Sequence, residues 1–299
     1  MRFYYSDSFD LNLPPGHRFP GTKYGLLRKA LLNNNILNED QLVAAPLAPP
    51  EALEIAHDPA YIAAIETGTI DPSAMRRIGF PWSPHIPRRA RATIGGALEA
   101  GRNALIDGLS GQLAGGTHHA HRGFGSGYCV YNDQAVVALT MLAEERVKKV
   151  AIIDLDVHQG DGTASILSGH DDVFIYSVHG EKNFPFRKVP STLDIPLPDG
   201  TSDTAYLDAL EETLPEVFSF QPDLVLYQAG VDPLAADSLG RMSLTHKGLM
   251  ARDRYVLSEC AMRSIPVSMA IGGGYAKPIE PTVEAYANTY RVAKEIYRF

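Results

Sequence analysis

Residues 150–162 read VAIIDLDVHQGDG, an apolar run that ends in two aspartates and a histidine. The run over 150–154 is aliphatic on both faces, which is typical of a strand covered on both sides of a parallel sheet. Runs of the same character follow at 173–177, 224–227 and 267–271, and apolar residues spaced three and four apart predict helices over 93–106, 132–146, 204–218 and 245–262. Strands alternating with helices predict an α/β fold, with a mainly parallel sheet sandwiched by helices.

Composition narrows the class of protein. The 299 residues are 45% hydrophobic and 21% charged, as in ordinary globular proteins, and no linker divides the chain, so we expect one domain over 1–299. No apolar run approaches the roughly 18 residues of a membrane span, and the N-terminus lacks a signal-peptide pattern. A formal net charge of −8 disfavours nucleic acid as the main ligand, and two cysteines, Cys129 and Cys260, fit a reducing compartment. We therefore expect a cytoplasmic protein that binds neither membrane nor nucleic acid directly.

Polar side chains follow each predicted strand at its carboxyl end, where parallel sheets bind ligands. After the first strand come Asp154, Asp156 and His158, which a period of two places on one side. Carboxylates so close together repel one another unless a cation lies between them, and Asp/His donors suit Zn²⁺. Asp232 after the third strand would complete a three-ligand site with one position open to water, the pattern of a catalytic zinc. Capping aspartates and a core histidine are the alternative interpretation.

A second cluster lies in the Gly-rich segment 115–121, which contains the adjacent histidines His118 and His119. Neighbouring side chains diverge, so we expect that the two rings do not both lie in the core. As general acid/base groups they would need carboxylate partners, for which Asp154 and Asp161 are available. The alternative is an exposed loop, and we expect His121 to be a loop residue only.

Aromatic residues complete the candidate site. Gly272–Gly274 would bring the Tyr275 hydroxyl to the same sheet edge as an oxyanion donor, a plain turn being the alternative. Tyr128 and Phe184 would face each other across a slot that suits an aliphatic arm with a polar head, although each alone also fits core packing. The prolines over 81–87 predict an irregular loop.

Taken together, these motifs resemble the zinc-dependent histone deacetylase and acetylpolyamine amidohydrolase superfamily, which has an arginase-like α/β fold. The resemblance extends over nearly the whole chain. The glutamine after His158 and the segment Asp237–Gly240 are most similar to the class IV branch and its bacterial relatives. The matching segments are HRFP at 17–20, KYGLLR at 23–28, HDPAYI at 57–62, GTHHA at 116–120, SGYC at 126–129, DLDVHQGDG at 154–162, IPLPDG at 195–200, AGVD at 229–232 and GGGY at 272–275.

The resemblance implies a role for each candidate residue. It implies one Zn²⁺ per chain on Asp156, His158 and Asp232. It also implies that His119, paired with Asp161, is the general base and then the general acid. His118, paired with Asp154, would be an electrostatic partner, and Tyr275 would donate a hydrogen bond to the scissile carbonyl. It further implies a structural K⁺ on oxygens of Asp154, Asp156, His158, Ser177 and Val178, and an acyl-lysine tunnel lined by Gly127, Tyr128 and Phe184.

The implied activity is zinc-dependent removal of acetyl or longer acyl groups from lysine side chains of proteins. Separately, the compactness of the chain favours a monomer. Alternatives are an acetylpolyamine or other small-amide deacetylase, a non-catalytic acyl-lysine binding module, and an arginase-type enzyme with two manganese ions. The sequence departs from the family pattern at Gln159 and Tyr128, where a second histidine and a phenylalanine are common. We find no counterpart over 76–85 of the acidic rim residue that grips the substrate backbone in some relatives.

Overall fold

The computed structural model describes residues 1–299 and contains one eight-stranded sheet in the order β2-β1-β3-β8-β7-β4-β5-β6. Every neighbouring pair of strands is parallel. From the central strand β4, the chain adds β5 and β6 on one side and later β7 and β8 on the other, so the strand order reverses at β4. The strands are β1 (Phe3–Tyr5), β2 (Leu42–Ala44), β3 (Leu109–Gln112), β4 (Val150–Asp154), β5 (Val173–Gly180), β6 (Leu193–Leu197), β7 (Leu224–Gln228) and β8 (Val267–Ala270).

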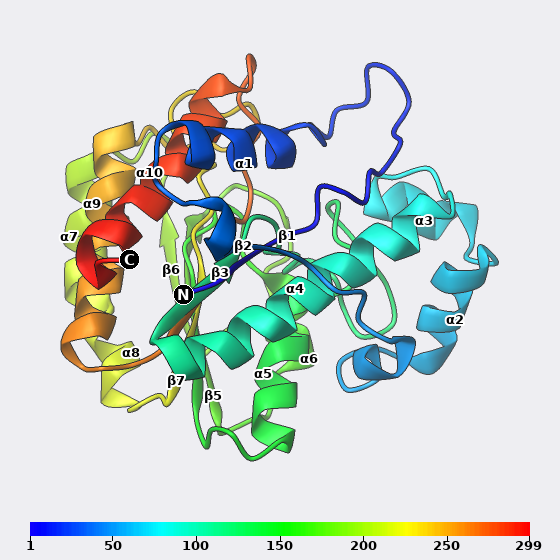
Figure 1. The fold of residues 1–299 in the computed structure, drawn as a ribbon, viewed down its shortest axis with the longest axis horizontal. Coiled ribbons are helices and arrows are strands. Elements are labelled where there is room, and N and C mark those ends of the chain that lie inside the picture. The colour runs from blue at the N-terminus through cyan, green and yellow to red at the C-terminus, as the bar shows by residue number, and fades with distance from the viewer.

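Helices cover both faces of this sheet (Figure 1). The buried cluster on one face includes residues of α1, α7, α8, α9 and α10. The cluster on the other face includes residues of α4, α5 and α6, and it extends to α2 and α3, which lie away from the sheet (Figure 1). The helices are α1 (Lys23–Asn33), α2 (Pro59–Thr67), α3 (Pro72–Ile78), α4 (His85–Asp107), α5 (Asp133–Ala143), α6 (Asp161–Ile166), α7 (Asp203–Thr213), α8 (Pro215–Ser219), α9 (His246–Met262) and α10 (Glu280–Tyr297).

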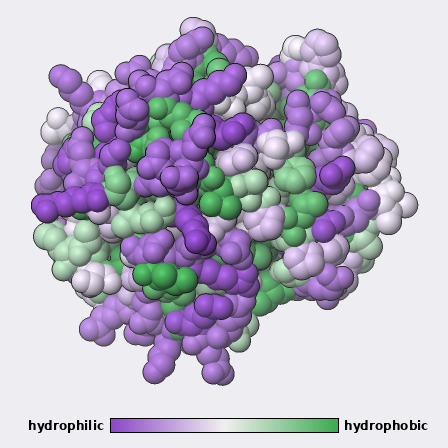
Figure 2. All heavy atoms as spheres, viewed as in Figure 1, coloured by the Kyte–Doolittle hydropathy of each residue, from purple (hydrophilic) through white to green (hydrophobic).

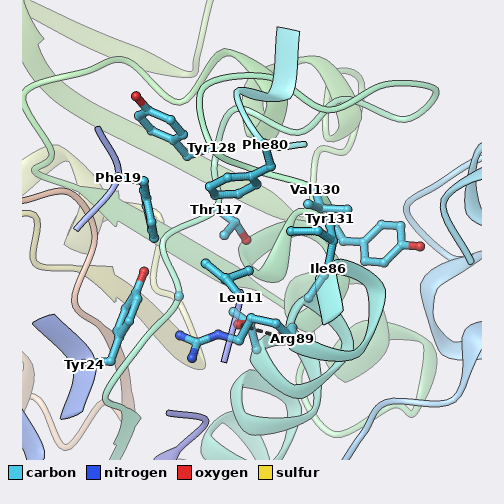
Figure 3. Close-up of a pocket in the computed structure, with 13 residues that line it drawn as sticks. Leu11, Phe19, Tyr24, Phe80, Ile86, Arg89, Thr117, Tyr128, Val130 and Tyr131 are labelled. Atoms are coloured by element: carbon cyan, nitrogen blue, oxygen red, sulfur yellow. Dashed lines mark hydrogen bonds between the residues drawn. The ribbon is translucent and has the colours of Figure 1, made fainter. Parts of the chain in front are cut away.

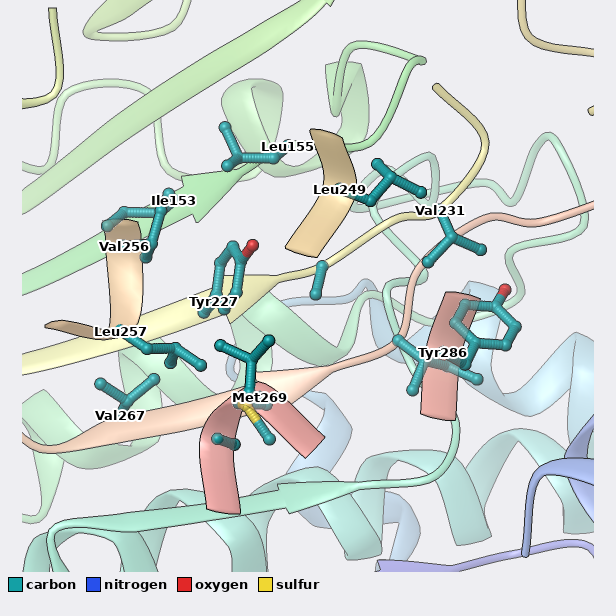
Figure 4. Close-up of a cluster of buried hydrophobic side chains, with 14 of the residues drawn as sticks. Ile153, Leu155, Tyr227, Val231, Leu249, Val256, Leu257, Val267, Met269 and Tyr286 are labelled. Atoms are coloured by element: carbon teal, nitrogen blue, oxygen red, sulfur yellow. The ribbon is translucent and has the colours of Figure 1, made fainter. Parts of the chain in front are cut away.

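Strand β4 shows how the sequence builds two cores. Its alternate residues Val150 and Ile152 belong to one buried cluster, while Ala151 and Ile153 belong to the other. In the second of these, Ile153 lies with Tyr227 of β7 and Met269 of β8 under the apolar face of α9 (Figure 4). Burial on both faces explains why the central strands read as continuous apolar runs.

The structure confirms the predicted α/β fold class and the four predicted strands, which are β4, β5, β7 and β8. One helix prediction and one loop prediction need correction. The helix expected over 204–218 is divided into α7 and α8 where Pro215, which has no N–H to donate, begins the second segment. The irregular loop expected over 81–87 ends early, because α4 begins at His85 and holds Pro87 in its first turn, where backbone N–H groups have no intrahelical partner.

The face of the molecule in Figure 2 is mainly hydrophilic, with small apolar patches between charged side chains. None of the helices combines the length and the apolar character that crossing a bilayer requires.

Candidate metal centre and active site

The candidate site lies at the carboxyl ends of β4 and β7, next to the reversal of strand order, where open α/β sheets bind ligands. Register pairs Asp154 with Gln228, so the segments that follow these two strands leave the sheet side by side. A Cβ at Gly230 would lie 2.6 Å from Oδ2 of Asp156, so glycine is needed for this close approach. The predicted convergence of strand ends therefore brings residues 154–158 and 228–232 together.

Asp156, His158 and Asp232 form a buried cluster whose ligand atoms all lie within 4.8 Å of one another. Nδ1 of His158 is 3.0 Å from Oδ1 of Asp156 and 3.0 Å from Oδ2 of Asp232. Two carboxylates and an imidazole converging on one point are a donor set that suits Zn²⁺ and similar divalent cations. The residues present therefore fit a single divalent metal.

The electrostatics of this cluster favour a cation. Burial and the neighbouring charge of Asp156 raise the pKa of Asp232 to about 7. Although burial disfavours the charged ring, hydrogen bonds and charges from Asp156 and Asp232 raise the pKa of His158 to about 10. Buried carboxylates thus hold positive charge strongly at this point, and a metal that binds here would displace the proton of His158.

The adjacent histidines have separate carboxylate partners. Nδ1 of His118 donates to Oδ2 of Asp154 at 2.7 Å, and Nδ1 of His119 donates to Oδ1 of Asp161 at 2.6 Å. Both rings are buried, with their centroids 4.1 Å apart, so the expectation that they could not share the core is wrong. Burial of both is tolerated because each ring finds a carboxylate inside the protein.

The two histidines differ in protonation. Burial and the charge of His118 lower the pKa of His119 to about 4, even though Asp161 opposes the change. Burial opposes charge on His118 as well, but Asp154 and Asp156 raise its pKa to about 9. At neutral pH His119 is therefore a neutral ring whose Nδ1–H is held by Asp161, which leaves Nε2 free to accept a proton.

His121 has a contact that its expected role as a loop residue did not include. Its Nε2 lies 3.1 Å from Oδ2 of Asp161, the oxygen that His119 does not use. The ring stacks on Phe124 with centroids 4.3 Å apart. The sequence could have indicated this contact, because His119 and His121 are two residues apart and could share one carboxylate.

The segment Gly272–Tyr275 passes directly against the candidate metal ligands. The N–H of Gly273 donates to Oδ2 of Asp156 at 2.6 Å, and a Cβ at Gly273 would lie 2.0 Å from Oδ2 of Asp232. Glycine is therefore required for the backbone to lie here, and the segment leads Tyr275 to the rim of the cluster. Burial and the charges of Asp156 and Asp232 raise the pKa of Tyr275, so its hydroxyl remains a hydrogen-bond donor.

Two residues without a predicted role support Tyr275. Oδ2 of Asp237 accepts the backbone N–H of Tyr275 at 2.6 Å. Lys23 is fully buried, donates to the carbonyl of Gly274 at 3.2 Å and places its Nζ 4.6 Å from the Tyr275 ring centroid. Burial lowers the pKa of Lys23 to about 8, so its charged form persists at neutral pH.

A cavity of about 440 Å³ opens above this cluster. His119, His158 and Tyr275 line it together with the three predicted tunnel residues Gly127, Tyr128 and Phe184. The remaining lining residues are Arg77, Ile78, Gly79, Ser126, Lys182, Asn183, Phe186, Leu239 and Arg241. The structure therefore places the candidate metal ligand, base and phenol in one pocket with the predicted walls.

Tyr128 separates this cavity from a smaller one of about 40 Å³, because its ring lines both. Phe19 and Phe80 pack against that ring at centroid distances of 5.1 and 5.5 Å, and Arg89 lies on the far side of the small cavity (Figure 3). Tyr128 has φ of 66°, a left-handed conformation that few side chains adopt, and this aromatic packing holds it.

A family model described as the histone deacetylase domain matches residues 17–290. The chain belongs to the histone deacetylase domain family. It is 42% identical to an uncharacterized protein of Picosynechococcus sp. over 98% of each chain. It is 32% identical to the acetoin utilization protein AcuC of Staphylococcus aureus, over 87% of this chain and 72% of that protein.

A solved structure shows the same fold. The crystal structure of an acetylpolyamine aminohydrolase from Burkholderia pseudomallei matches with a TM-score of 0.80 at 21% identity, covering 97% of each chain. The predicted resemblance to the histone deacetylase and acetylpolyamine amidohydrolase superfamily is thus confirmed, and the family supports a deacetylase hydrolase.

Proposed function

We propose that this protein is a zinc-dependent deacylase that hydrolyses acylated primary amines, with acyl-lysine of proteins as the substrate class. The observation that carries this proposal is the convergence of the Asp156–His158–Asp232 donor set, neutral His119 and the Tyr275 phenol on one cavity. Acetylpolyamines and other small amides are the alternative substrates, since a solved acetylpolyamine aminohydrolase shares this fold.

Each polar group has a chemical task in this proposal. When held by Asp156, His158 and Asp232, a divalent cation supplies Lewis acidity, which acidifies water and polarises the amide carbonyl. His119 accepts the proton of the attacking water and passes it to the leaving amine, while Asp161 fixes its tautomer. His118, charged beside Asp154, acts as an electrostatic partner, and Tyr275 donates to the carbonyl oxygen as negative charge develops there.

The remaining predictions concern the surroundings of the site. Gly127, Tyr128 and Phe184 would line the tunnel for the acyl-lysine stem. A structural K⁺ would lie on oxygens of β4 and β5, where register sets Asp154 beside Ser177; the predicted ligands are Asp154, Asp156, His158, Ser177 and Val178. A cytoplasmic location also remains a prediction, supported by two free cysteines, and so does a monomeric state.

Two alternatives have less support. An arginase-type site needs further carboxylates to bridge a second metal, yet the structure has one cluster of three metal-binding side chains. At the position after Gln159, a Cβ on Gly160 would lie 2.7 Å from Oδ2 of Asp154, so a further aspartate would collide there. A non-catalytic binding module would not need Tyr275 or both histidines, all of which are in place.

The test compares acyl-lysine peptides and acetylpolyamines side by side with protein stripped by a chelator and then reloaded with Zn²⁺. We expect amide hydrolysis by the reloaded protein, none by the stripped protein, and faster turnover of at least one acyl-lysine peptide than of the polyamines. Peptide binding without turnover by zinc-loaded protein would favour the binding module. Faster turnover of polyamines would favour the alternative substrate class.

A further inference from the structure

The mouth of the active-site cavity is lined by cationic side chains and by no carboxylate. Arg77 comes from the end of α3, Lys182 from the segment after β5, and Arg241 from the segment between β7 and α9. All three are exposed. Positive charge therefore reaches the mouth from three separate parts of the chain.

Little nearby negative charge compensates these cations. Arg241 lies 3.4 Å from Asp199, an exposed pair in which solvent weakens the interaction. Arg77 instead lies over the ring of Phe124, 4.8 Å from its centroid, and neither Arg77 nor Lys182 forms an ion pair. Glu181 is exposed next to Lys182 but does not line the cavity.

Asp237, the carboxylate beneath this rim, is directed inward. It accepts backbone N–H groups of Leu239 at 2.8 Å, Gly240 at 2.9 Å and Tyr275 at 2.6 Å. The whole chain carries a net charge of −8, so a cationic mouth is not a consequence of overall composition. The charged side chains that line the entrance are thus opposite in sign to the net charge of the chain.

The mouth also exposes an aromatic ring that continues the predicted tunnel wall. Phe186 is 84% exposed, and its ring lies edge-on to Phe184 with centroids 6.2 Å apart. An extended segment that enters the cavity would cover Phe186 while its side groups pass Arg77 and Lys182. The rim therefore offers apolar contact together with positive charge.

We propose that this mouth selects acylated amines that carry carboxylate groups at the far end of the stem from the scissile amide, and that it disfavours polycationic ones. The inference rests on the proposed deacylase function and assigns its substrate class. An acyl-lysine flanked by Asp or Glu would be attracted by the three cations, whereas the free ammonium groups of an acetylpolyamine would be repelled. Charge complementarity of this kind commonly changes association rates by tenfold or more at low salt.

The experiment measures kcat/KM of the zinc-loaded protein on two acetyl-lysine peptides of equal length, one with Asp and Glu flanks and one with Lys and Arg flanks. We expect the acidic peptide to be preferred by at least about tenfold, and the preference to shrink at high salt because exposed charges are screened. Free Nε-acetyl-lysine, which carries one carboxylate and one ammonium group, is compared with N-acetylputrescine, which carries one ammonium group and no carboxylate. This second pair shows whether the mouth prefers a carboxylate in a small molecule as well as in a peptide.

Lys182→Glu should lower the ratio of acidic to basic peptide turnover several-fold. Lys148→Glu is the matched control, because Lys148 is an exposed lysine just before the amino end of β4, away from the carboxyl ends that carry the site. Equal kcat/KM for the two peptides, a preference for the basic peptide or for N-acetylputrescine, or the same change in both variants would overturn this inference and leave the deacylase function standing. No turnover of any of the four substrates would overturn the deacylase function and the inference with it.

Discussion

Gly273→Ala should disable the metal centre while leaving the fold intact. The added Cβ would lie 2.0 Å from Oδ2 of Asp232 and 2.9 Å from Oδ2 of Asp156, whereas ordinary contact begins at 3.4 Å. A carboxylate or the Gly273 backbone must therefore move by more than about 1 Å. Metal–ligand distances tolerate displacements of only about 0.2 Å, so at least one ligand is lost or misplaced. Removing even an outer-shell partner costs about 10–100-fold in metal affinity, and this change should cost at least as much.

The assay is a titration of Zn²⁺ against a chromophoric chelator, with circular dichroism and thermal unfolding to confirm the fold. In free energy, the expected loss is at least about 1.4–2.8 kcal/mol of binding. Gly21→Ala is the matched control, because a Cβ there meets no atom within 4 Å and Gly21 has no positive φ. If folded Gly273→Ala bound Zn²⁺ with wild-type affinity, the assignment of Asp156 and Asp232 as ligands would be refuted.

Three further changes test other parts of the account. Tyr275→Phe should retain fold and metal but lower kcat by about 10²–10³-fold, the usual cost of an oxyanion donor, and near wild-type turnover would remove this role from Tyr275. Arg252→Met should cost about 3–5 kcal/mol in urea unfolding, because it leaves the buried carboxylate of Asp253, 2.8 Å from Arg252, without its partner and also removes the bonds to the carbonyls of Leu155 and Gly230; a loss below about 1 kcal/mol would contradict this. Burial lowers the pKa of His57 from 6.5 to about 4, so below pH 6.5 the unfolded chain binds a proton that the folded protein does not, and stability falls as the pH drops. Between pH 7 and pH 4 the wild type should therefore lose about 3 kcal/mol more than His57→Gln, and equal losses in the two proteins would exclude this linkage.

Strands β4, β5, β7 and β8 were predictable from sequence, whereas β1, β2, β3 and β6 were not. β4 and β7 are covered on both faces, so their apolar runs are continuous. β1 and β2 are three residues long, too short to show a period. β6 contains Pro196, which lacks a backbone N–H. A strand at the edge of a sheet tolerates proline because its outer side forms no hydrogen bonds with a neighbouring strand.

The cluster of Asp156, His158 and Asp232 was likewise predictable, because the ends of parallel strands meet at one edge of the sheet. The contacts that support the candidate catalytic groups were not predictable. Lys23 reaches Gly274 across 251 positions of sequence, and no local pattern indicates such a contact. The burial of both His118 and His119 also depends on partners from other segments, Asp154 and Asp161, whose positions only the folded chain fixes.

Metal content and activity, measured on the same preparation, test the central claim most directly. The account predicts one divalent ion per chain, loss of amide hydrolysis when it is removed, and recovery with one equivalent of Zn²⁺. It also predicts that Asp156→Asn and Asp232→Asn each abolish that recovery. Hydrolysis of acylated amines by metal-free protein, or two ions per chain in the active enzyme, would contradict it.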